Sequence, residues 1–329
     1  MKSVAPLALL LGCQSAPLTP SALDSAALLD GGYPAPLAAG TWRSIDVEGS
    51  EQWLLTRKAH AAIGVVVFVH GGPGAAMSPL AYAFDAPLLE HLDVVHWDQR
   101  AAGLSAQTLP AAESLTLARY VQDAAVVLRE VRASHPALPV ILVGHSWGTI
   151  VARGVAQSDP ELIEQLVLVG TVVSIARTQP LQHAALPEEV AVHVGPPPWT
   201  TPDTLGPVMQ ALSPQTLGRL APRLGALHEA SPDYDEAALR AASRGSLFTV
   251  EHLLPRIHQH DATTEPLQFQ MPVTFVHGER DLATPLTMAQ HYAASLTGEP
   301  DFVVFDDAAH FAMWESPRRF AALLKNTLR

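Results

Sequence analysis

One five-residue pattern constrains this chain more than any other: Gly144-His145-Ser146-Trp147-Gly148. An aliphatic run, Val140 to Val143, precedes it, and a helical pattern, Ile150 to Gln157, follows it. A serine between two glycines at a strand-to-helix junction is typical of a sharp turn that lifts the serine hydroxyl out of a sheet. Glycines are needed there because the turn is strained and its flanks pass close to other strands. The pattern therefore predicts a nucleophilic Ser146.

A second pattern, a buried strand followed by a glycine-rich loop, lies N-terminal to the serine and could supply a donor for its oxyanion. Gly64 to Val69 is apolar on both faces, as in a buried parallel strand, and it runs into the loop His70 to Gly74. A tetrahedral intermediate on the serine needs two hydrogen-bond donors for its oxyanion. We expect one from the backbone N–H of Trp147 and the other from that of Gly72, with Gly71 as the alternative.

An acid and a base follow the serine along the chain. The strand Pro272 to Val276 leads to Asp281, and the last strand, Asp301 to Phe305, leads to His310. Ser146, Asp281 and His310 occur in the order that the triads of α/β-hydrolase folds use. His310 would accept the serine proton, and Asp281 would orient the imidazole. Asp281 can also be interpreted as a helix N-cap, and the weaker candidates for the acid are Asp306, Asp307 and Asp261.

Several of these segments together resemble the proline iminopeptidase group of α/β-hydrolases. The resemblance rests on His70 to Gly74, on Asp98 to Ser105, on the Ser146 pattern, and on the segments around Asp281 and His310. It covers roughly residues 40–173 and 271–329. It departs from the group at Ala101 and Ala309, where glycine is usual, and at His145. The resemblance implies cleavage of an N-terminal residue, proline above all, from a short peptide or amide.

The remaining pattern predicts one α/β-hydrolase core with an insertion. Thr41 to Val47 and Glu51 to Arg57 read as a hairpin, and alternating strands and helices follow, which predicts a mostly parallel central sheet flanked by helices. Strands disappear between residues 174 and 266, after the sixth strand, where we expect a helical lid. The predicted domains are a signal and tether (1–36), the core in two parts (37–173 and 267–329) and the lid (174–266).

Acidic lid residues hold the free substrate amine in the iminopeptidase group. Glu188, Glu189 and Glu251 are the candidates here, although solvated surface carboxylates remain the favoured interpretation. Three lid histidines beside Asp261 match no metal-binding motif, and we expect surface histidines instead; they are His252, His258 and His260. No cofactor or metal is required by the predicted chemistry.

The composition favours a large globular enzyme and excludes two other classes. Of the 329 residues, 48% are hydrophobic and 16% are charged, which excludes a disordered chain. The formal net charge of −12 argues against a nucleic-acid partner, which requires a basic face. The expected partner is a small-molecule or short-peptide substrate. The sequence does not determine the oligomeric state.

The N-terminal segment predicts where in the cell the protein is located. A short apolar run, Ala5 to Gly12, follows Lys2 and ends at Leu10-Leu11-Gly12-Cys13. This resembles the lipobox of bacterial lipoproteins, with Cys13, the only cysteine of the chain, as the lipidated residue. The run is too short to span a bilayer. We therefore expect a cell-envelope protein held to the membrane by lipid alone; the alternative is a cytoplasmic protein.

The sequence thus predicts a serine hydrolase that forms an acyl-enzyme. An aminopeptidase-like activity is the first expectation, and a carboxylesterase or lactonase for small esters is the alternative, because both would use the same catalytic residues. A haloalkane dehalogenase or epoxide hydrolase is disfavoured, since those enzymes need a carboxylate in place of Ser146. A non-catalytic surface lipoprotein on a hydrolase fold is a remote alternative.

Overall fold

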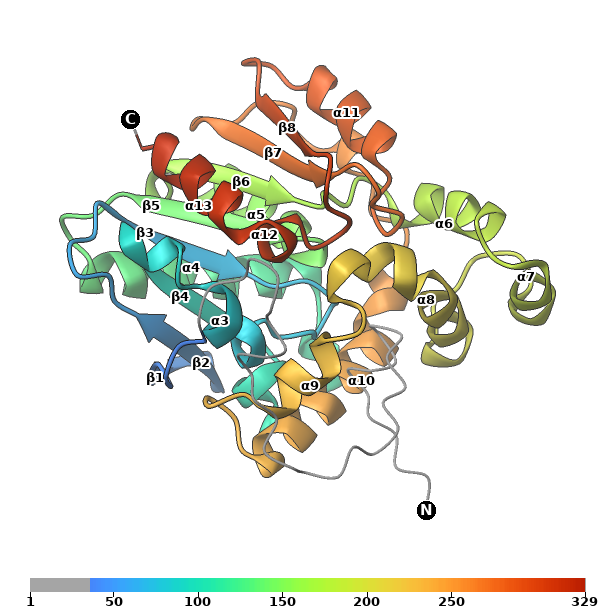
Figure 1. Ribbon diagram of the computed structural model, residues 1–329, viewed down its shortest axis with the longest axis horizontal. Helices are drawn as coiled ribbons and strands as arrows, with labels where there is room; N and C mark the ends of the chain where they lie inside the picture. The colour runs from blue at the N-terminus through green and yellow to red at the C-terminus, as the bar shows by residue number, and fades with distance from the viewer. Residues whose placement is uncertain (1–35, 329) are drawn as a thin grey trace.

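One eight-stranded sheet runs through the computed structural model, which describes residues 36–328 (Figure 1). The strand order across the sheet is β1-β2-β4-β3-β5-β6-β7-β8. The strands are β1 (Thr41–Val47), β2 (Ser50–Arg57), β3 (Gly64–Val69), β4 (Leu92–Asp98), β5 (Val140–His145), β6 (Gln165–Val169), β7 (Val273–Gly278) and β8 (Asp301–Phe305).

All strands from β3 to β8 run parallel to one another, while β1 and β2 form the predicted antiparallel hairpin at one edge. The carboxyl ends of parallel strands meet at the same edge of a sheet. The segments after β3, β5, β7 and β8 carry the predicted site residues. The sheet topology therefore brings these segments to one edge, although they lie up to about 240 positions apart in the sequence.

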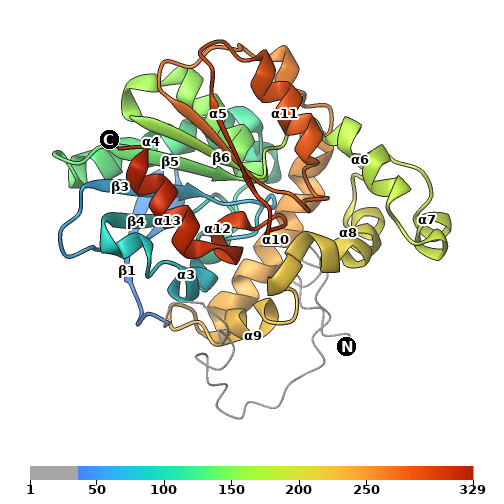
Figure 2. The ribbon, with the colours of Figure 1, turned by 45° about the horizontal axis from the view of Figure 1, so that its top comes forward.

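Helices cover both faces of the sheet because successive residues of each buried strand point to opposite faces. On β3, Val65 and Val67 belong to the same core cluster as residues of α4 and α5, whereas Val66 and Phe68 pack with residues of α3 and α13. Figure 2 shows α3, α12 and α13 on the near face. These helices are α3 (Ser78–Phe84), α4 (Leu117–Ser134), α5 (Trp147–Ser158), α11 (Leu286–Ser295), α12 (Ala312–Glu315) and α13 (Pro317–Asn326).

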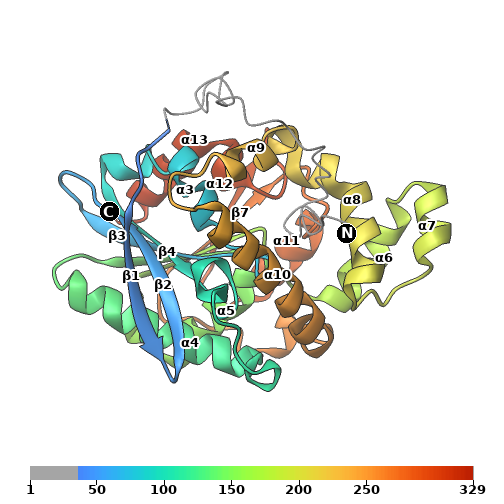
Figure 3. The same ribbon diagram turned by 90° about the horizontal axis from the view of Figure 1, so that it is seen from below.

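Five α-helices lie between β6 and β7, at the position predicted for the lid. They gather beside the carboxyl edge of the sheet, with α7 farthest from the core (Figures 1 and 3). The longest, α10, packs closely on the loop after β4, since a Cβ on Gly245 would lie 2.3 Å from the Ala101 carbonyl oxygen. The lid helices are α6 (Ile175–Ala184), α7 (Glu188–Val194), α8 (Pro202–Leu217), α9 (Leu224–Glu229) and α10 (Glu236–Ile257).

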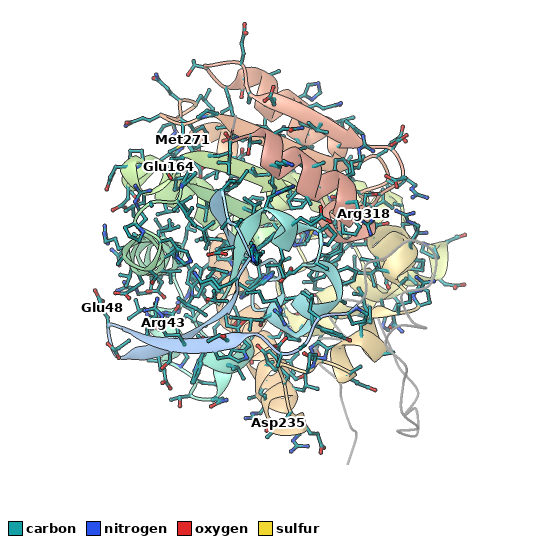
Figure 4. All side chains as sticks on the ribbon, turned by 60° about the vertical axis from the view of Figure 1, so that its left-hand side comes forward. Arg43, Glu48, Glu164, Asp235, Met271 and Arg318 are labelled. Atoms are coloured by element: carbon teal, nitrogen blue, oxygen red, sulfur yellow. The ribbon has the colours of Figure 1, made fainter. Side chains whose placement is uncertain are left out.

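Many charged side chains lie on the outside of the molecule, whereas a smaller set, which includes Asp98, Asp281 and Glu315, is buried. Figure 4 labels five of the exposed ones: Arg43, Glu48, Glu164, Asp235 and Arg318. Among residues 36–328, no helix is long and apolar enough to cross a bilayer. The predicted α/β-hydrolase fold, with its mostly parallel sheet and flanking helices, is confirmed.

Candidate active site

Ser146 occupies the sharp turn between β5 and α5. Its backbone φ of 53° and ψ of −123° lie in a region that residues other than glycine rarely adopt. The flanking glycines leave no room for a side chain. A Cβ on Gly144 would lie 2.7 Å from the Gly148 carbonyl oxygen, and one on Gly148 would lie 2.0 Å from that of Val69. The structure therefore contains the turn that the sequence predicts, and Ser146 lines a cavity.

His310 hydrogen-bonds to Asp281 beneath the same cavity. The distance from His310 Nδ1 to Asp281 Oδ2 is 2.8 Å, and the side chains are almost fully buried. Asp281 Oδ2 also accepts from the Thr284 hydroxyl (2.7 Å), while its Oδ1 accepts from the backbone N–H groups of Ala283 and Thr284. The carboxylate thus contacts the imidazole and also accepts from the backbone of the turn that follows it. The helix N-cap interpretation is wrong, because α11 begins at Leu286 with Pro285 at its N-cap position.

Asp281 is held in its ionised form. Burial opposes ionisation, but the neighbouring His310 and the hydrogen bonds to the carboxylate outweigh it and lower the pKa of Asp281 to about 2. Because Nδ1 of His310 is bound to this carboxylate, Nε2 is the ring nitrogen left to exchange a proton. His310 lines the same cavity as Ser146.

The other carboxylates considered for this role lie elsewhere. Asp306 pairs with Arg319, and Asp307 pairs with Arg219. Asp261 caps a short turn by accepting from the backbone N–H of Thr263. These three carboxylates are bound to other partners, which leaves Asp281 as the acid that contacts His310.

The loop after β3 packs directly against the serine turn. A Cβ on Gly71 would lie 3.0 Å from Ser146 Cβ and 3.0 Å from His145 Nδ1. Gly72 has a φ of +114°, which glycine adopts at little cost. Gly72 and Trp147, the two residues expected to supply the oxyanion donors, both line the cavity.

Gln99 connects the two halves of this predicted oxyanion hole. Its Nε2 donates to the His70 carbonyl oxygen (2.8 Å), and its Oε1 accepts from the indole N–H of Trp147 (3.0 Å). Its backbone N–H also donates to His70 Nε2 (3.2 Å), so this nitrogen must be unprotonated. Burial lowers the pKa of His70 to about 4, which agrees with a neutral ring. No motif in the sequence singles out Gln99, and its only signal there is its place in the Asp98 to Ser105 loop.

His145 contacts both the ring and the backbone of His310. Its Nε2 lies 3.1 Å from the His310 carbonyl oxygen, and the centroids of the two rings are 4.7 Å apart. Burial, followed by the nearby His310, holds the pKa of His145 well below its usual value. A neutral His145 can therefore donate from Nε2 to that carbonyl and fix the backbone of His310.

The cavity has a volume of about 160 Å³ and lies between the sheet edge and the lid. The loop after β3, the turn at Ser146 and the segment around His310 form one side of the cavity. Helices α6, α8 and α10 form the other side. Its walls are mainly apolar, and the apolar lining includes Met77, Leu80, Ile150, Ile175, Leu205, Met209, Leu254, Ile257, Phe311 and Trp314.

The acidic lid residues named from the sequence do not reach this cavity. Glu188 and Glu189 begin α7, Glu251 lies on α10, and all three are exposed. Two of the lid histidines bind other side chains: His258 contacts Gln179, and His260 contacts Arg153. Within residues 36–328, no group of three or more His, Cys, Asp or Glu side chains is arranged to hold a metal ion.

Comparison with known proteins agrees with this architecture. Residues 64–317 match the family described as the alpha/beta hydrolase fold. The chain belongs to the α/β-hydrolase family. This hydrolase is 25% identical over 305 residues to the probable aminopeptidase YbaC of Bacillus subtilis, which covers 87% of this chain and 96% of that protein.

Two further relatives of this α/β-hydrolase carry the name expected from its motifs. A proline iminopeptidase of Heyndrickxia coagulans is 26% identical over 274 residues, covering 80% of this chain and 90% of the relative. The crystal structure of proline iminopeptidase from Mycobacterium smegmatis superposes with a TM-score of 0.62 at 19% identity, covering 88% of this chain and 97% of that one. The resemblance to the iminopeptidase group is thereby confirmed.

Proposed function

We propose that this α/β-hydrolase cleaves carboxylic esters or amides through an acyl-enzyme on Ser146. The observation that supports this most directly is the hydrogen bond of 2.8 Å between His310 and Asp281 in a site where His310 and the strained Ser146 line one cavity. No cofactor or metal is needed for this chemistry.

The proposed reaction proceeds in two steps. His310 Nε2 takes the proton of the Ser146 hydroxyl as Ser146 Oγ attacks the substrate carbonyl carbon, and the protonated imidazole then gives that proton to the leaving group. The backbone N–H groups of Gly72 and Trp147 would stabilise the oxyanion. In the second step His310 Nε2 takes a proton from water as the water oxygen attacks the acyl carbon, and it returns that proton to Ser146 Oγ as the bond between the acyl carbon and Oγ breaks. Asp281, ionised because of its lowered pKa, stabilises the imidazolium in both steps.

A fluorophosphonate probe tests the nucleophile. We expect the probe to label Ser146 in the intact protein, and Ser146→Ala to lose labelling and turnover, since loss of a triad member removes several orders of magnitude in rate. Ser158→Ala is the matched control, because Ser158 ends the same helix and is exposed. Full activity in Ser146→Ala would exclude the mechanism.

An aminopeptidase activity is the second candidate, and the named relatives support it. It predicts turnover of prolyl or alanyl arylamides with a free amine and none of their N-acetyl forms. A comparison of free and N-acetylated arylamides tests it directly. The exposed positions of the candidate lid carboxylates give it no support from the site itself.

We also propose that the protein is a lipoprotein of the cell envelope. Cys13 lies outside the described residues, and the proposal rests on the segment Leu10 to Cys13. Two or more acyl chains at a cysteine would hold the protein firmly, whereas one chain holds only marginally. Intact-mass measurement of the mature protein from its native host tests this. An unmodified N-terminus at Met1 would favour the cytoplasmic alternative.

A further inference from the structure

The cavity beside Ser146 contains no charge to pair with a substrate amine. Among residues 36–328, none of those that line it is an aspartate or glutamate. Three carboxylates are buried in the segments around it, and each is bound elsewhere. Asp281 holds His310, Asp98 accepts from the hydroxyls of Ser78 and Tyr234, and Glu315 accepts from the backbone N–H of Ala309.

The two glutamines that line the cavity are also bound to the protein. Gln179 accepts from the backbone N–H of Trp199 (3.0 Å) and donates to the Trp199 carbonyl oxygen (2.9 Å). Gln182 lies within 3.4 Å of the carbonyl oxygens of Leu282 and Ala283 and donates to them. These bonds occupy both ends of the Gln179 amide and the Nε2 of Gln182. A glutamine amide is uncharged, so neither side chain supplies the counter-charge that a desolvated ammonium group needs.

A buried hydroxyl in the lining has no hydrogen-bond partner. Within residues 36–328, Thr216 Oγ1 is the only atom of a lining side chain that is buried without a hydrogen-bond partner; Thr216 itself is 3% exposed. Thr216 lies in the last turn of α8 beside His310, since its carbonyl oxygen accepts from the His310 backbone N–H (3.1 Å). A hydroxyl offers a hydrogen bond to a neutral substrate oxygen and does not compensate a full positive charge.

From these contacts we infer that the acyl side of the substrate is neutral and apolar, so that the enzyme hydrolyses esters of apolar carboxylic acids in preference to peptides with a free N-terminal amine. This inference rests on the proposed serine mechanism. An ammonium group brought into this lining would lose its water without gaining a counter-charge, whereas an apolar chain would gain contact with Leu205, Met209 and Leu254. An apolar cavity of about 150 Å³ accommodates a molecule the size of benzene, which sets the scale of the acyl group.

Two phenyl esters that differ by a single amine test the inference. They are phenyl hexanoate and the phenyl ester of 2-aminohexanoic acid, with each kcat/KM divided by the uncatalysed hydrolysis rate of the same ester. We expect the corrected value to favour the hexanoate by about 100-fold or more. Equal or greater turnover of the amino ester would overturn the inference. Failure of the fluorophosphonate probe to label Ser146 would instead refute the serine mechanism.

A single substitution should reverse part of this preference. Met209→Glu places a carboxylate in the lining, and we expect it to shift the ratio between the two esters by at least 10-fold toward the amino ester. Val192→Glu is the matched control, since Val192 is 78% exposed on α7 of the same lid and should leave the ratio unchanged. The ratio does not depend on how much of the variant folds. An unchanged ratio in Met209→Glu would show that the acyl group binds elsewhere.

Discussion

Gln99 offers a test of how the oxyanion hole is held together. The change Gln99→Met keeps an unbranched side chain of similar length but removes both side-chain hydrogen bonds, to the His70 carbonyl oxygen and from the Trp147 indole. His70 directly precedes Gly71 and Gly72, and Trp147 directly follows Ser146 in the serine turn. The substitution should therefore loosen the spacing between the two predicted oxyanion donors.

The magnitude follows from the two bonds. Each buried polar group left without a partner costs about 1 to 3 kcal/mol of stability, so we expect a clear decrease in the free energy of unfolding without loss of the fold. Removing one oxyanion donor outright costs about 10² to 10³ in kcat. Displacing donors that are still present should cost less, so we expect kcat to fall by about 10- to 100-fold. KM should change little, because the apolar lining of the lid stays in place.

The assay separates a positioning role from a merely structural one. We would measure kcat and KM with phenyl hexanoate, and the affinity for a boronic acid that forms a tetrahedral adduct on the serine. Boronic acid affinity should weaken in parallel with kcat/KM, because both depend on the oxyanion donors. Gln107→Met, at an exposed position near the end of the same loop, is the control. A lowered melting temperature with unchanged kcat and unchanged inhibitor affinity would refute the reasoning.

Three further predictions follow from the site. Asp281→Asn should keep the fold and reduce kcat by about 10³- to 10⁴-fold, since the imidazole would lose its orienting carboxylate. Steady-state kinetics and a circular dichroism spectrum of the variant would check this. A wild-type rate would show that another residue is the acid. Burial lowers the pKa values of His70 and His277 to about 4, so their neutral forms stabilise the fold fully above pH 6.5 and this stability is lost as pH falls to about 4. Each should contribute up to about 3 kcal/mol, and an equal urea midpoint at pH 7.5 and pH 4.5 would contradict it. The cavity volume of about 160 Å³ predicts that phenyl hexanoate exceeds phenyl dodecanoate in kcat/KM by about 10-fold or more, whereas a rate that rises steadily with chain length would indicate an open groove.

The sequence by itself determined the fold and the catalytic candidates. The glycines around Ser146 are required by the backbone of one turn, and such a requirement is local enough to appear as a five-residue pattern. Apolar runs such as Gly64 to Val69 indicated strands buried on both faces, hence a parallel sheet. A parallel sheet brings the carboxyl ends of its strands to one edge, and for this reason the order of Ser146, Asp281 and His310 predicted a shared site.

Only the tertiary structure decided the surroundings of the site. The choice among several aspartates, the role of Gln99, and the surface positions of Glu188, Glu189 and Glu251 depend on contacts between residues far apart in the chain. Helical and strand periodicity predict local structure, but they do not predict which side chains make contact when they lie far apart in the sequence. The lid shows this most clearly. Its sequence contains the carboxylates Glu188, Glu189 and Glu251, yet packing leaves these three exposed and the cavity lining mainly apolar, with a buried hydroxyl at Thr216 that has no hydrogen-bond partner. The sequence shows which charged residues a segment contains, but the packing of the helices determines where each of them lies relative to a cavity.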